Sequence, residues 1–152
     1  LVDRIEKSND DEYLFDRHNI DEHIEEAQST RVELPSGGWV MFETTQAMTT
    51  IDVNSGNHDA PARAVNLEAA PIIARQIRLR GLGGLIAIDF IDMAESPDGE
   101  SVLQALDDGF TGDKQPVRIG PMSEFGVVEM TRRRGGMTLA QSMQQIRSAV
   151  DK

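Results

Sequence analysis

The chain has 152 residues, no cysteine and a formal net charge of −11 at pH 7. Its length fits one domain with a full core, the lack of cysteine excludes disulfides and thiolate metal sites, and the negative charge argues against a general binder of polyanions. No apolar run reaches the roughly 18 residues of a membrane span, so we expect a cytoplasmic protein without a membrane partner.

An acidic arm with one short helix is expected over residues 1–30, which hold ten acidic and three basic residues. Asn19 can cap this helix, because Ile20, Ile24 and Ala27 follow it at helical spacing.

Three strands are predicted between residues 31 and 54. Val32 and Leu34 share one face of the first, which ends at a Pro-Ser-Gly-Gly turn. The runs WVMFET and MTTIDV flank the polar TQA and indicate a hairpin. We expect Trp39 and Phe42 in the core, on opposite faces of their strand, although Trp39 could also offer a stacking surface.

A helix follows and is expected to end near Arg80, with Gly81 as its stop. Its start is open between two alternatives. Asn66 can cap it, which places Pro71 in the interior at a cost of about 3 kcal/mol, with a kink there. Otherwise the helix begins at Pro71.

The stretch GGLIAIDFIDM indicates a strand buried on both faces. A helix marked by Val102, Leu106 and Phe110 follows, and PVRIG and FGVVEMT are two further strands. A last helix is predicted from Thr138, with Gln141 completing a capping box. The apolar stripe of this helix consists of Leu139, Met143, Ile146 and Val150. The alternation of strands and helices predicts an α/β fold, a mixed sheet with flanking helices.

Two acidic residues close apolar strands: Asp52 in TTIDVNSG and Asp89 in AIDFIDM. If these strands are parallel neighbours, both carboxylates emerge at the sheet edge where open α/β sheets place their ligands. Two convergent carboxylates favour a cation between them, and hard oxygen ligands favour Mg²⁺ or Mn²⁺. The alternative, which the pattern leaves open with equal weight, is that both residues only cap turns.

The chain resembles the catalytic region of the ribonuclease E/G family over roughly Phe15 to Arg134. The resemblance lies in the blocks LPSGGWVMFETTQAMTTIDVNSG, NLEAAPIIARQIRLRGLGGLIAIDFIDM and FGVVEMTRRR. Members of that family are endoribonucleases that cut single-stranded RNA with a magnesium ion. The resemblance implies that residues 1–30 match the end of an RNase H-like subdomain. It implies a DNase I-like catalytic subdomain over 31–137, followed by a C-terminal helix over 138–152.

The resemblance also implies roles for individual residues. Asp52 and Asp89 match the two metal-binding aspartates of the family, and Asn54 matches the asparagine that positions the attacked phosphate or the water. Asp92 belongs to the same motif without an equally clear role. Because it follows Asp89 by three residues, we expect it on the opposite face of an extended strand, in a structural hydrogen bond.

The chain departs from the family pattern in several places. The S1 domain and the 5′-end sensor that precede this region in relatives do not appear in the sequence. The stretch RGGMTLAQSM replaces the cysteine pair that links subunits through zinc, so we expect no zinc. Pro116 aligns with a basic residue of many relatives, and Glu124 replaces a positive residue before the FG dipeptide. We therefore expect reduced affinity for RNA.

Two arginine clusters are weaker candidates for RNA contact. Each has an alternative role, either as a solvated strand end or in pairs with acidic side chains. The residues are Arg75, Arg78 and Arg80 in RQIRLR, and Arg132, Arg133 and Arg134 in RRR. His18, His23 and His58 show no ligand spacing and are expected to be surface or turn residues.

Two functional classes follow from these observations. The first is a Mg²⁺-dependent endoribonuclease, or its catalytic fragment, that hydrolyses single-stranded RNA in RNA processing or decay and accepts Mn²⁺. The second is a non-catalytic module that keeps the fold for RNA binding or assembly. In either case we expect a homo-oligomer that forms through the DNase I-like subdomain or the C-terminal helix.

Overall fold

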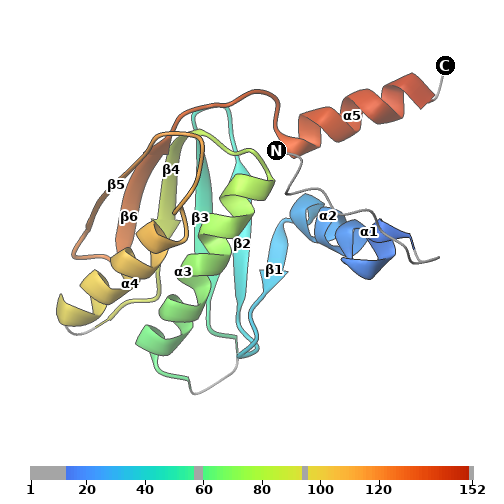
Figure 1. Cartoon of the computed structure of the whole chain (residues 1–152). Helices are drawn as coiled ribbons and strands as arrows, with labels where there is room; N and C mark the ends of the chain where they lie inside the picture. Colours follow the sequence, from blue (N-terminus) through green and yellow to red (C-terminus); the bar gives the residue numbers. More distant parts are fainter. Residues whose placement is uncertain (1–12, 57–59, 94–95, 151–152) are drawn as a thin grey trace, which may run out of the picture.

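A six-stranded mixed sheet carries the fold in this computed structural model, which describes residues 13–56, 60–93 and 96–150 (Figure 1). The strand order is β1-β2-β3-β4-β6-β5. Only β3 and β4 pair in parallel, and the other four pairs are antiparallel. The predicted α/β mixed sheet is therefore confirmed. The strands are β1 (Arg31–Glu33), β2 (Trp39–Thr44), β3 (Met48–Asn54), β4 (Gly84–Asp89), β5 (Val117–Met122) and β6 (Val127–Arg132).

Two helices cover one face of this sheet. Helix α3 (Ala62–Leu79) is the crossover between the parallel strands β3 and β4, and α4 (Ser96–Asp108) lies beside it on the same face (Figure 1). Alternate strand residues point into the layer between sheet and helices and form the core. Its members include Val40, Ile51, Ile88 and Val128 from the sheet, and Ile73, Ile77, Val102 and Leu106 from the helices.

The opposite face of the sheet is open to solvent within the described residues. Its side chains alternate with the core residues, so Asp52, Asp89 and Glu129 are all exposed there. Leu85 on the same face keeps 40% of its surface exposed. The strand GGLIAIDFIDM is therefore buried on one face only, which corrects the prediction of burial on both. The carboxylates of this motif can stay hydrated, because the open face leaves them in contact with water.

Helix α3 contains Pro71 in its interior and begins at Ala62, after Pro61. Asn66 is a buried residue of the first turns and not the cap, so the predicted cap at Asn66 is wrong, as is a start at Pro71. The cost of an interior proline, about 3 kcal/mol, is offset because the inner face of this 18-residue helix packs into the core.

The N-terminal helices α1 (Leu14–Arg17) and α2 (Ile20–Gln28) lie beside the edge of the sheet that begins with β1 (Figure 1). Asn19 stands at the predicted boundary, but its side chain makes no capping bond. Its backbone is left-handed with φ of 49°, a conformation that Asn tolerates better than most residues, and so it turns the chain between the two helices. The acidic residues 1–12 lie outside the described residues.

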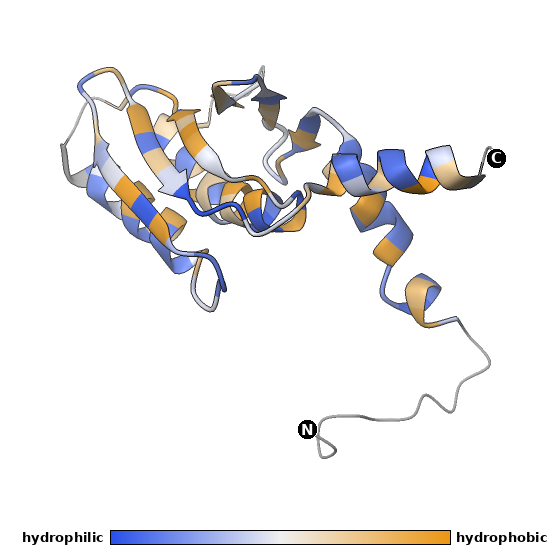
Figure 2. Ribbon diagram, turned by 90° about the horizontal axis from the view of Figure 1, so that it is seen from above, coloured by the Kyte–Doolittle hydropathy of each residue, from blue (hydrophilic) through white to orange (hydrophobic). Residues whose placement is uncertain are grey.

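The C-terminal helix α5 (Leu139–Val150) projects away from the sheet (Figure 2). Its predicted capping box is confirmed, because the Thr138 amide donates to Gln141 Oε1 at 2.9 Å and the Gln141 amide donates to Thr138 Oγ1 at 3.2 Å. The apolar stripe is not buried on the sheet: Leu139 and Met143 are half-buried, Ile146 is 56% exposed, and the side chain of Val150 lies outside the description. Self-association through this helix remains a prediction. In the described part of the chain, no helix has the length and apolar character needed to span a bilayer.

Candidate active site

Asp52 and Asp89 lie directly opposite each other across the parallel pair β3 and β4. Both carboxylates are exposed on the open face, at the carboxyl ends of their strands. Neighbouring strands lie about 4.8 Å apart, so two negative charges face each other at short range. No lysine or arginine in the described residues forms an ion pair with either of them. The expected convergence of the two strand ends is therefore present in the fold.

Asn54 stands next to this pair because it lies two residues after Asp52 on the same face of β3. Its Nδ2 donates to Asp52 Oδ2 at 2.7 Å, which fixes the orientation of that carboxylate. The turn before β2 packs against the backbone here. A Cβ at position 38 would lie 2.4 Å from the Asn54 carbonyl oxygen, so only Gly38 permits the approach.

Trp39 lies beside Asn54 on the open face, in register with it across β2 and β3. Its ring stacks under the Arg31 guanidinium at 4.0 Å and is half-buried. Phe42 points to the other face and is a core residue. The two aromatics thus occupy opposite faces as predicted, but Trp39 is not part of the core.

Asn66 of α3 holds the segment that follows Asp89. Its Nδ2 donates to the Ile91 carbonyl at 2.8 Å, and its Oδ1 accepts from the Ile91 amide at 3.1 Å. A buried amide with both groups satisfied is expensive to disturb, because each lost partner leaves a buried polar atom unpaired. This clamp positions the loop that carries Asp92. The sequence contains no signal for it, because an Asn at a helix start is normally interpreted as a cap.

Replacing Asn66 with Asp is expected to loosen this loop, because the carboxylate keeps the size of the amide but cannot donate to the Ile91 carbonyl. The free energy of unfolding should fall by about 1–3 kcal/mol. Hydrogen exchange provides a local readout: the Ile91 amide should exchange faster in the variant, relative to amides in α4. Unchanged exchange at Ile91 would show that the clamp does not hold the loop.

The turn between β5 and β6 is fixed beside the same strand end. Ser123 Oγ accepts from the amides of Phe125 and Val127 at 3.3 and 3.2 Å, and the Phe90 amide donates to the Gly126 carbonyl at 3.2 Å. Phe125 at the tip of the turn is 82% exposed. This exposed aromatic residue was missed in the sequence, although a Phe before a turn glycine is an available signal.

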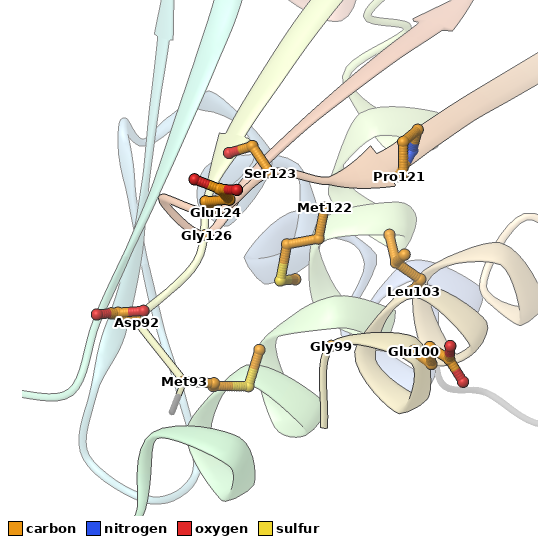
Figure 3. A pocket seen from close by; sticks show the side chains of 10 residues that line it. All are labelled: Asp92, Met93, Gly99, Glu100, Leu103, Pro121, Met122, Ser123, Glu124 and Gly126. Atoms are coloured by element: carbon orange, nitrogen blue, oxygen red, sulfur yellow. The ribbon is translucent and has the colours of Figure 1, made fainter. Parts of the chain in front are cut away.

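A cavity of about 420 Å³ lies between α4, this turn and the segment after β4 (Figure 3). It is lined by Asp92, Met93, Gly99, Glu100, Leu103, Pro121, Met122, Ser123, Glu124 and Gly126. Asp92 is exposed at its border, and its carboxylate points away from Leu103. The predicted structural hydrogen bond is not found, because the Asp92 carboxylate makes none within the described residues.

Arg132 is a buried structural residue, which corrects its assignment to an RNA-contacting cluster. Its Nε and Nη2 donate to the two carboxylate oxygens of Asp113 at 2.7 and 3.0 Å, and its Nη1 donates to the Leu82 carbonyl at 2.7 Å. Both side chains of the pair are only 7% exposed. The hydrogen bonds from Arg132 hold the pKa of Asp113 below its ordinary value.

Arg80 requires the same correction, because its guanidinium docks α2 onto the sheet. Its Nη1 donates to the Ser29 carbonyl at 2.7 Å and its plane lies 4.2 Å from the ring centre of Phe42. Burial lowers the pKa of Arg80 from its ordinary value, and the nearby Glu26 carboxylate opposes this shift. Arg75 pairs with Glu26 at 3.4 Å, whereas Arg78 is exposed.

The arginine clusters also lie far from the carboxylates. Arg132 is in register with Gly84 at the start of β4, and Asp89 ends that strand, so about 16 Å of strand separates the two positions. Arg133 and Arg134 are exposed beyond this far end. Helix α3 also ends there, since it leads through Gly81 into β4. The described residues thus do not place a basic cluster beside the aspartates.

The two histidines within the described residues provide no metal site. His18 and His23 are exposed on the N-terminal helices, and His58 lies outside the described residues. No three His, Asp or Glu side chains gather closely enough to hold a metal in the described part of the chain. Among the described residues, a metal at the candidate site would therefore have two carboxylates as ligands at most, with Asn54 beside them.

The model of the ribonuclease E/G family matches residues 1–135. The chain belongs to the ribonuclease E/G family. It is 39% identical over 140 residues to ribonuclease G of Salmonella typhimurium, a match that covers 88% of this chain and 29% of that protein. It is 42% identical over 132 residues to ribonuclease E of Nostoc sp., covering 83% of this chain and 19% of that protein.

Ribonuclease E of Haemophilus influenzae is 38% identical over 152 residues, which covers 96% of this chain and 16% of that protein. The chain therefore spans less than a third of the length of these relatives. Membership of the ribonuclease E/G family agrees with the α/β fold and its mixed sheet.

Proposed function

We propose that the chain is the catalytic part of an endoribonuclease that hydrolyses phosphodiester bonds of single-stranded RNA with Mg²⁺, for which Mn²⁺ can substitute. The observation that carries this proposal is the register pair of Asp52 and Asp89 on the open face of the sheet. Membership of the ribonuclease E/G family supports the reaction class.

The residues at this site fit a hard divalent cation. Mg²⁺ is usually held in proteins by one or two carboxylates and completes its coordination with waters and substrate phosphates. Asp52 and Asp89 supply two carboxylates that face solvent and have no cationic partner among the described residues. Facing like charges are stabilised when a cation lies between them. When bound, Mg²⁺ would lower the pKa of a coordinated water and stabilise negative charge on the phosphate.

Asn54 has a positioning role in this proposal. Its Nδ2 donates a hydrogen bond to Asp52 Oδ2 at 2.7 Å. The side-chain oxygen Oδ1 of Asn54 is then left to accept a hydrogen bond from the attacking water. The clamp of Asn66 on Ile91 and the fixed turn at Ser123 keep the neighbouring strand end rigid. Rigid placement supplies much of the rate in phosphoryl chemistry.

A non-catalytic module remains the second candidate, and one observation favours it. The arginine clusters lie at the far end of the sheet from Asp52 and Asp89, so the described residues offer little positive charge to hold RNA at the carboxylates. Tyr13, at the start of α1, is 81% exposed, and Leu14 and Phe15 are also exposed. Apolar side chains of this kind are normally covered by another surface.

A single-turnover cleavage assay tests the proposal. We expect slow cleavage of single-stranded RNA that requires Mg²⁺ or Mn²⁺, because a chain with a charge of −11 repels its substrate. The rate should fall steeply with salt, because salt weakens the contacts between basic side chains and phosphates that hold the RNA. Substrates with 5′-phosphate and 5′-hydroxyl ends should be cleaved alike. Asp89→Asn should reduce the rate by about 100-fold or more.

Glu129→Gln is the matched control for this assay, because it removes an exposed carboxylate from the same sheet face without touching the pair. It should cleave like the wild type. Equal rates for the wild type and Asp89→Asn would reject catalysis and leave the non-catalytic module.

A further inference from the structure

The cavity beside the carboxylate edge has an unusual lining for a protein that acts on RNA. Within the described residues, the charged residues that line it are all acidic: Asp92, Glu100 and Glu124. Such a rim repels a phosphate, so the sugar-phosphate backbone of an RNA strand is a poor occupant. Its volume of about 420 Å³ falls within the range of pockets that hold small ligands, about 300–1,000 Å³.

The floor of the cavity suits a flat ring. The Met122 side chain points into the space, and Met93 and Leu103 line it from the strand end and from α4 (Figure 3). All three side chains are partly buried and pack against the core, which holds them in place. An acidic rim would also suit a lysine side chain. A methionine sulfur makes favourable contacts with aromatic rings, however, and this favours a nucleobase as the occupant.

The position of the cavity connects it to the candidate active site. Asp92 lines it and follows Asp89 by three residues, and the turn at Ser123 forms another wall. That turn is hydrogen-bonded to the strand end through Phe90 and Gly126, with 3.2 Å between amide nitrogen and carbonyl oxygen. A strand of RNA attacked at Asp52 and Asp89 would pass this cavity with a neighbouring nucleotide.

We propose that this cavity is a subsite for one nucleobase of the RNA, and that it selects bases that carry an amino group; this inference rests on the proposed function. Carboxylates only accept hydrogen bonds, so Glu124, next to Ser123 in the turn, complements the amino group of cytosine and repels the carbonyl oxygen that uracil carries at the same ring position. Ser123 Oγ already accepts two amide hydrogen bonds, and its hydroxyl hydrogen can donate to a base carbonyl.

The test compares oligocytidine and oligouridine of equal length, because these probes share charge and size and differ mainly in this one group. Binding is measured by fluorescence anisotropy on the full chain in metal-free buffer, where no metal-dependent cleavage occurs. Oligocytidine should bind about tenfold tighter. The methyl signals of Met93 and Met122 should shift on binding, while that of Met48, at the start of β3, should not.

The variant Glu124→Gln keeps the shape of the rim and replaces an acceptor by a group that also donates. It should reduce the preference for cytosine to about twofold or less. Glu129→Gln, an exposed acid outside the cavity, should keep the full preference.

Equal affinity of the wild type for both probes would overturn the subsite, as would a shift of Met48 without Met93 and Met122. Equal affinity for both probes together with tight binding of a lysine-rich peptide would identify a protein-docking cavity instead. The outcome is separate from that of the cleavage assay. A cytosine preference without any metal-dependent cleavage would keep the subsite and reject the proposed catalysis.

Discussion

Asp52→Asn or Asp89→Asn is expected to abolish Mn²⁺ binding while leaving the metal-free protein at least as stable as the wild type. Asp52 and Asp89 face each other across two parallel strands with no cationic partner in the described residues. Like charges directly opposite in a sheet are destabilising, so removing one should raise the free energy of unfolding by about 0.2–1 kcal/mol. The same change removes one of the two carboxylates that the described residues offer to the metal.

Titration calorimetry and thermal unfolding measure the two parts of this prediction. Mn²⁺ at about 100 times its dissociation constant should stabilise the wild type by about 2.7 kcal/mol and leave both variants unchanged. Glu129→Gln should bind Mn²⁺ like the wild type, because its carboxylate lies opposite Ala87 and not beside the pair. Asp92→Asn should affect binding less than either change in the pair. Undiminished Mn²⁺ binding by Asp52→Asn or Asp89→Asn would remove these residues from the metal site.

The second large effect is expected for Arg132, whose replacement by Gln should lower the free energy of unfolding by about 3–5 kcal/mol. The guanidinium and the Asp113 carboxylate are both buried, and two hydrogen bonds of 2.7 and 3.0 Å join them. Removing the arginine leaves a buried negative charge without its partner. Arg133→Gln, an exposed neighbour, should change stability by about 0.5 kcal/mol or less.

The pH dependence of this loss of stability in Arg132→Gln tests whether the ion pair with Asp113 causes it. The pKa of Asp113 is depressed in the folded protein, mainly by hydrogen bonds from Arg132. A depressed carboxyl pKa contributes stability above the unfolded value of about 3.9, and this stability disappears as the pH falls through the folded pKa. Urea unfolding should therefore show a large difference between wild type and Arg132→Gln at pH 7 that narrows in acid. A difference that stays constant with pH would show that the ion pair is not its source.

Local chemistry and periodicity were sufficient to place most elements of this fold. The hairpin of β2 and β3, the capping box at Thr138 and the placement of the two aspartates at strand ends all depend on residues close together in the chain. Hydrophobic alternation and turn residues carry this information because they act over a few residues. A crossover helix of suitable length lies between β3 and β4, but the sequence left their parallel pairing as a condition, which the structure shows to be met.

The roles of Asn66, Arg80 and Arg132 depend on partners that lie far away in the chain. Asn66 looks like a helix cap and is instead a clamp on Ile91, 25 residues later. Arg132 looks like part of a basic patch and is instead buried against Asp113, 19 residues earlier. Whether a charged or amide side chain faces water or a buried partner is settled when the layers pack, because burial then requires each polar group to find its counterpart. A short window of sequence contains the side chain but not the partner that packing brings to it.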